Sequence, residues 1–104
     1  MRGDVYRLRA PRDAQGHEQR GARYAVVVQS DLLPLSTWLV APTSTTARPA
    51  SFRPKIQING TPTLVLAEQT TAIDPQRLGP RAGRLALHEM AELEAALRAV
   101  LDLR

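Results

Sequence analysis

Short apolar runs separated by polar loops fill the first two thirds of the chain. Residues 5–9 alternate apolar and basic side chains, which predicts a strand buried on one face. Residues 24–28 form a continuous, largely β-branched run, which predicts a central strand buried on both faces, and residues 37–41 predict a second such strand that ends at Pro42. Two further predicted strands, 52–58 and 63–67, flank Asn59-Gly60, a pair that favours a tight hairpin turn.

The period of the pattern changes near the C-terminal end. Six apolar residues recur at helical spacing, with three charged residues assigned to the opposite face: Leu87, Met90, Leu93, Leu97, Val100 and Leu101 against Glu89, Glu92 and Arg98. Asp74-Pro75 predicts the N-cap and first position of a brief helical turn. Five or six short strands followed by one helix predict a mainly β (α+β) fold, a small curled antiparallel sheet or barrel closed by a C-terminal helix.

The size and composition of the chain narrow its class. Its 104 residues are enough for one hydrophobic core, so we expect a single domain over residues 1–104. The absence of cysteine excludes disulfides, zinc ribbons and thiol nucleophiles. No apolar run approaches the roughly 18 residues of a membrane span, and residues 1–7 contain no stretch typical of a signal peptide, so we expect a cytoplasmic protein without a membrane partner.

The charge balance points to an acidic partner. Fourteen basic residues against ten acidic ones give a net charge of +4, and every basic residue except Lys55 is arginine. Arginine is the donor best shaped for phosphate and carboxylate, so a nucleic acid or an acidic protein is the expected partner. A GC-rich genome would produce the same bias towards arginine. Aromatic residues make up only 4% of the chain, too few for an extended platform that stacks bases.

Two polar clusters follow predicted strands or lead into them. Residues 17–23 directly precede the predicted central strand, whose rigid start would hold Arg23 in a fixed direction for a functional role. An ordinary solvated loop with a surface arginine explains the same residues. Residues 43–46 carry four hydroxyls, which can also serve only to satisfy backbone groups at a strand end. His17 and His88 lack a third partner at metal-site spacing, so neither a metal nor another cofactor is expected.

Several blocks of the sequence resemble the MazF/PemK family of toxin–antitoxin endoribonucleases. They occur in order and at the family's spacing: residues 2–6 (RGDVY), residues 17–23 (HEQRGAR, similar to xEQxGxRP), residues 40–44 (VAPTS, similar to vaPlTS) and residues 68–74 (EQTTAID, similar to DQirtiD). The resemblance implies an SH3-like, PemK-type β-barrel with a C-terminal helix that acts as a homodimer. It also implies metal-independent cleavage of single-stranded RNA at short motifs, which inhibits translation, and inhibition by an antitoxin with an acidic, disordered tail.

The resemblance also assigns roles to individual residues. The family's catalytic arginine falls on Arg23 and its hydroxyl residue on Ser44, with Glu18 as the third catalytic candidate. The candidates for RNA binding are His17, Gln19, Thr43 and Gln69. A guanidinium stays protonated, so Arg23 would stabilise negative charge on phosphorus and assist the leaving oxygen. Glu18 or His17 would then serve as the general base.

Two positions depart from the family pattern. Tyr24 stands where the family usually has proline, which concerns the aim of Arg23, and Ala86 stands where a serine usually caps the helix. Two other functions stay open: a non-nuclease toxin that binds a protein such as DNA gyrase, as fold-related CcdB toxins do, and a catalytically silent relative retained for antitoxin binding and autoregulation. The combination of Glu18, Arg23 and Ser44 favours the nuclease.

Overall fold

The structure, a computed structural model, describes residues 1–9 and 23–104. Within these residues it contains seven strands, two short 3-10 helices (η) and one α-helix. In chain order they are β1 (Asp4–Leu8), β2 (Tyr24–Val27), β3 (Trp38–Ser44), β4 (Lys55–Ile58), β5 (Thr61–Val65), η1 (Ala67–Gln69), β6 (Thr71–Ile73), η2 (Pro75–Arg77), β7 (Leu78–Arg84) and α1 (Leu87–Leu101). The expected mainly β class with a C-terminal helix is confirmed.

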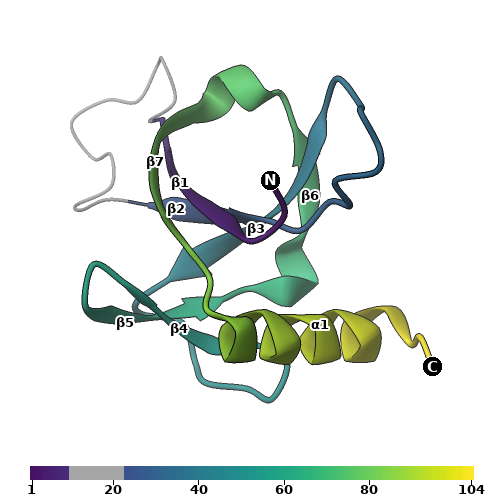
Figure 1. Cartoon of the computed structure of the whole chain (residues 1–104). Coiled ribbons are helices and arrows are strands. Elements are labelled where there is room, and N and C mark those ends of the chain that lie inside the picture. The colour runs from purple at the N-terminus through teal and green to yellow at the C-terminus, as the bar shows by residue number, and fades with distance from the viewer. Residues whose placement is uncertain (10–22) are drawn as a thin grey trace.

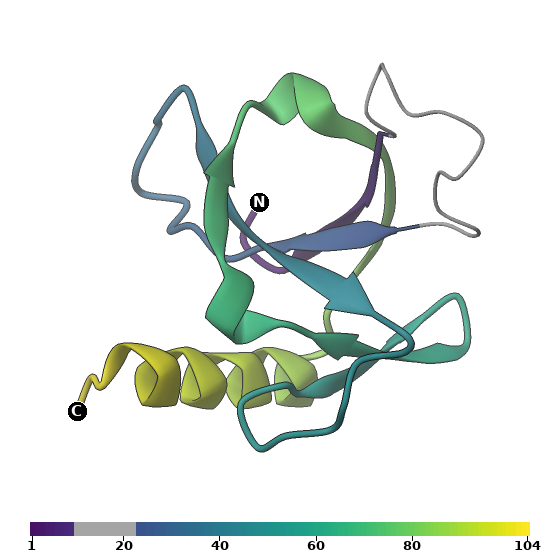
Figure 2. The same cartoon turned by 180° about the vertical axis from the view of Figure 1, so that it is seen from behind.

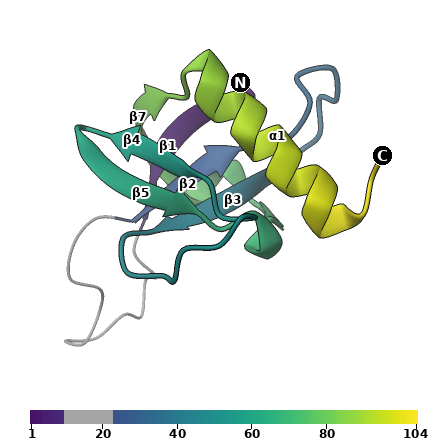
Figure 3. The same ribbon diagram turned by 90° about the horizontal axis from the view of Figure 1, so that it is seen from below.

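The strands form one curled antiparallel sheet in the order β4-β5-β3-β2-β1-β7, with β6 paired to β3. Strand β3 pairs with β2 and β6 along its first part and with β5 along its last two residues, so it belongs to both parts of the sheet. Strands β7, β1, β2, β3 and β6 curl into a ring that η2 closes (Figures 1 and 2). The β4–β5 hairpin and α1 lie beneath this ring, with the helix packed beside the hairpin (Figure 3).

Strand β2 is central and buried on both faces, as predicted. Val26 packs in the larger core between the ring, the β4–β5 hairpin and α1, together with Ile56, Val65 and Leu93. Ala25 and Val27 face the smaller core inside the ring. The side chains of that inner core are Ala25, Val27, Val40 and Leu78, with Tyr6, Leu8, Trp38 and Ile73 packed against them. Alternation along β2 therefore sends successive side chains to two different cores.

The predicted hairpin is confirmed, although its strands begin and end elsewhere. Asn59 and Gly60 both have positive φ, 51° and 80°, as a two-residue turn whose twist matches antiparallel strands requires. The first strand is shorter than the predicted 52–58 and the second covers Thr61–Val65 instead of 63–67. The second strand ends early because the chain turns into η1.

Pro42 does not end its strand, contrary to the sequence prediction. It lies opposite Ala25 within β3, which continues to Ser44. Proline removes one donor but keeps its carbonyl, and this oxygen accepts a hydrogen bond from the backbone N–H of Leu66 at 2.8 Å. The polar residues Thr43 and Ser44 therefore lie in a paired strand and not in a loop.

The helix has the predicted position but a narrower buried face. Leu93 and Ala96 are buried, whereas Leu87 is 92% exposed and Val100 and Leu101 also face solvent. Glu89, assigned by its spacing to the exposed face, is buried. The predicted apolar stripe was therefore too wide, because only the middle of the helix lies over the core.

The buried Glu89 carboxylate partly compensates for the missing N-cap side chain at Ala86. Ala86 has no side-chain acceptor, but Glu89 Oε1 accepts a hydrogen bond from the Ala86 backbone N–H at 2.8 Å. Its other oxygen, Oε2, accepts from the Gln57 N–H of β4 at 2.9 Å. The carboxylate thus accepts from the backbone N–H at the start of α1 and places a negative charge at the positive end of the helix dipole. Through Gln57 it also joins the helix to the hairpin.

Candidate functional site

The sheet brings Arg23 and Ser44 to the same place. The β2–β3 ladder pairs Ala25 with Pro42, and continuing this register by two residues puts Arg23 opposite Ser44. Directly opposed residues of antiparallel strands share one face, here the inner face of the ring. Arg23 is exposed and Ser44 half-buried, so both side chains are open to a ligand.

The backbone at Arg23 is fixed from the β1 side and from the β3 side. Its carbonyl accepts a hydrogen bond from the Leu8 N–H at 2.8 Å. The next carbonyl, that of Tyr24, accepts from the Thr43 hydroxyl at 3.1 Å, and Tyr24 is paired with Arg7. Strand pairing thus fixes the entry into β2 where the family usually has proline, so the Tyr24 departure leaves the anchor of Arg23 intact.

Ser44 is held as a hydrogen-bond donor. Its Oγ accepts from the backbone N–H groups of Thr46 at 3.1 Å and Ala47 at 2.9 Å, so both lone pairs are engaged. The hydroxyl also lies 3.4 Å from Thr46 Oγ1. Either hydroxyl can donate in this contact. With both lone pairs engaged, Ser44 has its proton to offer, to Thr46 Oγ1 here or to a phosphate oxygen that takes its place, and it is not suited to act as a base.

A second contact braces the loop that follows Ser44. Arg53 Nε donates to Glu68 Oε2 at 3.0 Å and its Nη1 donates to the Arg48 carbonyl at 3.0 Å, which ties this loop to η1. The hydrogen bond from Arg53 outweighs burial and lowers the pKa of Glu68. The loop that begins with the turn at Ser44 is thus attached to η1 through Arg53.

The remaining predicted residues divide into two groups. Thr43 is buried on the outer face with its hydroxyl engaged by Tyr24, and Gln69 is exposed in η1, on the side of β3 away from β2. Neither is brought next to Arg23. His17, Glu18 and Gln19 lie outside the described residues.

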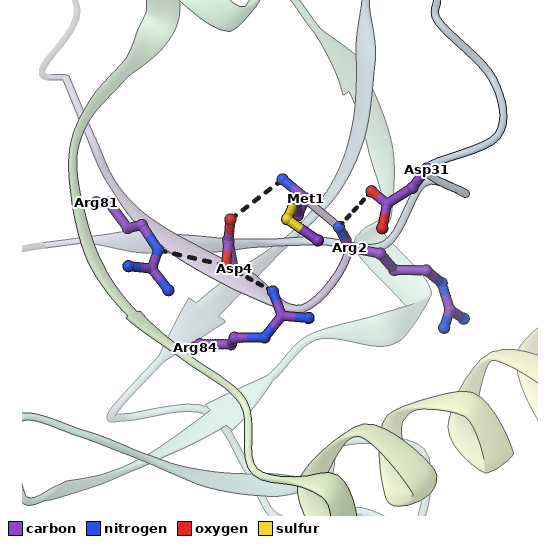
Figure 4. A network of polar contacts seen from close by, with 6 residues as sticks. All are labelled: Met1, Arg2, Asp4, Asp31, Arg81 and Arg84. Carbon is purple, nitrogen blue, oxygen red and sulfur yellow. Dashed lines mark hydrogen bonds and ion pairs between the residues drawn. The ribbon is translucent and has the colours of Figure 1, made fainter.

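Sequence reasoning missed a group of charges around Asp4 (Figure 4). Asp4 is 6% exposed, and its carboxylate meets three cations: Arg84 Nη1 at 2.8 Å, Arg81 Nε at 3.3 Å and the amino group of Met1 at 3.1 Å. Burial raises the pKa of Asp4, but the hydrogen bond from Arg84 and the charges of the amino group and Arg81 outweigh it and lower the pKa below its ordinary value. Asp4 therefore stays ionised at neutral pH.

The described part of the chain offers neither a metal-binding cluster nor a membrane-spanning helix. Residues 1–9 and 23–104 contain no group of three or more His, Cys, Asp or Glu side chains that could together hold a metal ion. The same residues include no helix with the length and apolar character needed to span a bilayer.

Comparison of the sequence with known proteins gives two matches over nearly the whole chain. The family model described as PemK-like, MazF-like toxin of type II toxin–antitoxin system matches residues 1–101. A candidate toxin of Mycobacterium tuberculosis designated Rv3098A is 41% identical over 104 residues, which cover 99% of this chain and 98% of that protein.

Solved structures share the fold at low sequence identity. An endoribonuclease from a mycobacterial species, in complex with its cognate antitoxin, superposes with a TM-score of 0.79 at 21% identity, over 100% of this chain and 96% of that one. The M. tuberculosis toxin MazF-mt6 gives 0.76 at 20% identity, over 97% and 98%. A MazE–MazF structure from Deinococcus radiodurans gives 0.75 at 18% identity, over 99% and 95%.

Proposed function

Because the chain belongs to the PemK/MazF family of type II toxins, we propose that it is a metal-independent endoribonuclease that cleaves single-stranded RNA. The opposition of Arg23 and Ser44 on neighbouring strands supports this proposal, since a cation and a hydroxyl donor then share one face of the sheet. These are the groups needed to hold a phosphodiester. Cleavage of RNA in the cytoplasm would inhibit translation and growth.

The proposed reaction uses the substrate's own nucleophile. The ribose 2′-oxygen attacks the adjacent phosphorus while its proton passes to a base, and the bond from phosphorus to the 5′-oxygen breaks. The products are a 2′,3′-cyclic phosphate and a 5′-hydroxyl. Arg23 stabilises the extra negative charge on phosphorus and gives a proton to the leaving 5′-oxygen. The proton that the base took from the 2′-oxygen then returns to Arg23 through solvent, which restores both groups. Ser44 donates its hydroxyl proton to a non-bridging oxygen.

The base is proposed from the loop that enters β2. Glu18 is the first candidate and His17, with an ordinary pKa near 6.5, the second. Gln19 would contact the RNA from the same loop, and Gln69 would contact it farther from the reacting phosphate. Thr43 contributes indirectly, because its hydroxyl holds the carbonyl next to Arg23.

The test of the proposed function is cleavage of a long RNA by the purified protein in EDTA. We expect discrete fragments with 5′-hydroxyl ends, mapped by primer extension, because Arg23 takes the part that a metal ion plays in other nucleases. RNA that stays intact with and without added Mg²⁺ would contradict the proposal and support the silent relative or the protein-binding toxin. Cleavage only with Mg²⁺ would contradict the metal-independent mechanism.

We further propose a cognate antitoxin with an acidic, disordered tail as the regulatory partner. The mycobacterial endoribonuclease and the D. radiodurans MazF are each described in complex with an antitoxin. The net charge of +4 on this chain suits an acidic segment, which would compete with RNA for the same basic surface.

We also propose that the protein is a homodimer, on the evidence of an ordered apolar surface. The loop before β3 exposes Leu32, Leu33 and Leu35 to solvent. Gln29 holds this loop, because its Nε2 donates to the Leu33 carbonyl at 2.9 Å and its Oε1 accepts from the Leu39 N–H at 3.1 Å. The C-terminal end of α1, with its own exposed apolar residues, lies on the same side of the molecule (Figures 1 and 2). Rigid apolar surface of this kind is typical of an interface.

Light scattering at micromolar concentration checks this prediction. The wild type is expected to have twice the mass of the chain, and Leu32→Asp to be a folded monomer, because a charge would be buried in the interface. Leu87→Asp, at a residue that is 92% exposed at the other end of α1, is the matched control and should remain dimeric. A monomeric wild type, or a dimeric Leu32→Asp, would count against this interface.

A further inference from the structure

Two register shifts between β1 and β7 place Arg81 and Arg84 on the same face of the sheet. The β1–β7 ladder pairs Leu8 with Leu78, Tyr6 with Arg81 and Asp4 with Arg84, so every third residue of β7 meets every second residue of β1. The register shifts between these pairs absorb the extra residues. Leu78, Arg81 and Arg84 therefore share one face, whereas regular alternation would separate Arg81 from Arg84.

This face is the one that holds the proposed site. The Leu8 N–H donates to the Arg23 carbonyl, and Leu8 is paired with Leu78. Ser44, Arg23, Leu8 and Leu78 are therefore successive cross-strand neighbours on β3, the start of β2, β1 and β7, and they form one row across the sheet. Arg77, an exposed residue, comes directly before Leu78. Arg81 and Arg84 follow about 7 Å and about 13 Å farther along the strands, since each residue of β1 adds about 3.3 Å. Arg81 and Arg84 thus form an arginine ladder on this face, and the exposed Arg77, next to Leu78, adds a cation at the end of the ladder beside the row of the site.

The ladder carries surplus positive charge in a fixed geometry. Arg81 and Arg84 both bind Asp4 Oδ1, yet their side chains are 53% and 47% exposed (Figure 4). With the Met1 amino group, three cations share one carboxylate, which among the described residues is the only acidic partner of the two arginines. The ionised Asp4 fixes one side of each guanidinium and leaves donors on the other side for a further anion.

The composition of this edge favours a polynucleotide over a protein. Leu78 and Leu85 are buried, and the exposed residues of β7 are Pro80, Arg81 and Arg84. Protein partners are usually anchored by apolar or aromatic side chains. Apart from Met1, the large apolar residues exposed among the described residues lie in the loop before β3, on β3, and on or just after α1. Phosphates need only charge and donors.

We propose that the arginine ladder binds backbone phosphates of the RNA beyond the cleaved bond and so guides the strand towards Arg23. This inference rests on the proposed nuclease function for the identity of the strand. It assigns to β7 a role in holding RNA without reading its sequence, because phosphate contacts fix position and carry no base information.

The test measures binding of a single-stranded DNA version of the RNA substrate, which keeps the phosphates but lacks the 2′-hydroxyl nucleophile. Fluorescence anisotropy over a series of KCl concentrations gives the slope of log K against log salt. Each lost phosphate contact lowers the magnitude of this slope by about 0.7 for a single strand. The double variant Arg77→Gln/Arg81→Gln should therefore bind more weakly, with a slope smaller by about 1.4. Arg84 is left in place so that Asp4 keeps its closest partner.

Matched controls separate the ladder from general charge and from catalysis. Lys55→Gln/Arg98→Gln, an equal loss of two charges at exposed residues of β4 and α1, should keep the wild-type slope. The double variant should have a raised KM on a long RNA with an unchanged kcat. A wild-type slope in the double variant would overturn the proposal, and so would an unchanged slope with weaker binding of polyglutamate, which would assign the ladder to an acidic peptide. If the wild type cuts no RNA, the proposed function fails, yet the DNA slopes still decide whether the ladder binds phosphates.

Discussion

Replacing the ribose by 2′-deoxyribose at the cut nucleotide is expected to abolish cleavage at that position. The 2′-oxygen is the proposed nucleophile, and no described side chain at the site is suited to replace it: Arg23 is a cation and Ser44 Oγ has both lone pairs engaged by backbone N–H groups. The measurement is single-turnover cleavage of an oligonucleotide that carries one deoxynucleotide at the mapped position.

The same substitution one nucleotide away provides the control. It should leave the rate close to that of the all-ribose substrate, because the phosphates and the nucleophile are unchanged. Undiminished cutting of the oligonucleotide with deoxyribose at the cut nucleotide would show that water or a protein group attacks phosphorus. The proposed mechanism would then be wrong.

Arg23→Ala is expected to reduce the single-turnover rate by about 10²–10³-fold or more, the usual cost of losing a preorganised donor to a developing charge. Arg23 both stabilises negative charge on phosphorus and protonates the leaving oxygen in the proposed mechanism. Its backbone position depends on the Leu8 and Thr43 hydrogen bonds and not on its side chain, so the variant should fold. Circular dichroism checks the fold, and a folded Arg23→Ala that cuts at the wild-type rate would refute the site.

Arg23→Lys separates charge from shape. It keeps the positive charge but loses the planar fork of donors, so we expect severe impairment of cleavage with RNA binding retained. Arg98→Ala, on the exposed face of α1, is the charge-matched control for Arg23→Ala and should cut normally.

Ser44→Ala should be milder than Arg23→Ala because it removes one neutral donor, although it also releases the turn at Thr46 and Ala47. Thr43 is not placed to compensate, since its hydroxyl is buried on the other face.

The errors of the sequence interpretation share a physical origin. Local pattern locates an element that declares itself within its own residues, so β2 was found from its continuous apolar run, the hairpin turn from Asn59-Gly60 and α1 from its helical period. Strand β7 was missed because its register shifts replace a period of two by a period close to three, and β6 is too short for a period. Glu89 was assigned to the wrong face because its burial depends on the N–H of Gln57, 32 residues away, which no local pattern reports.

The sequence by itself determined the mainly β class, the C-terminal helix, the family and the identity of Arg23 and Ser44 as the central candidates, since each of these depends on local pattern or on residue type at fixed spacing. Only the tertiary structure decided which side chains share a face. Strand register set Arg23 opposite Ser44, turned Thr43 away from them and gathered Arg81 and Arg84 on Asp4. The reason is that a one-residue change of register moves a side chain to the other face of a sheet, and register is set by pairing between segments distant in the chain.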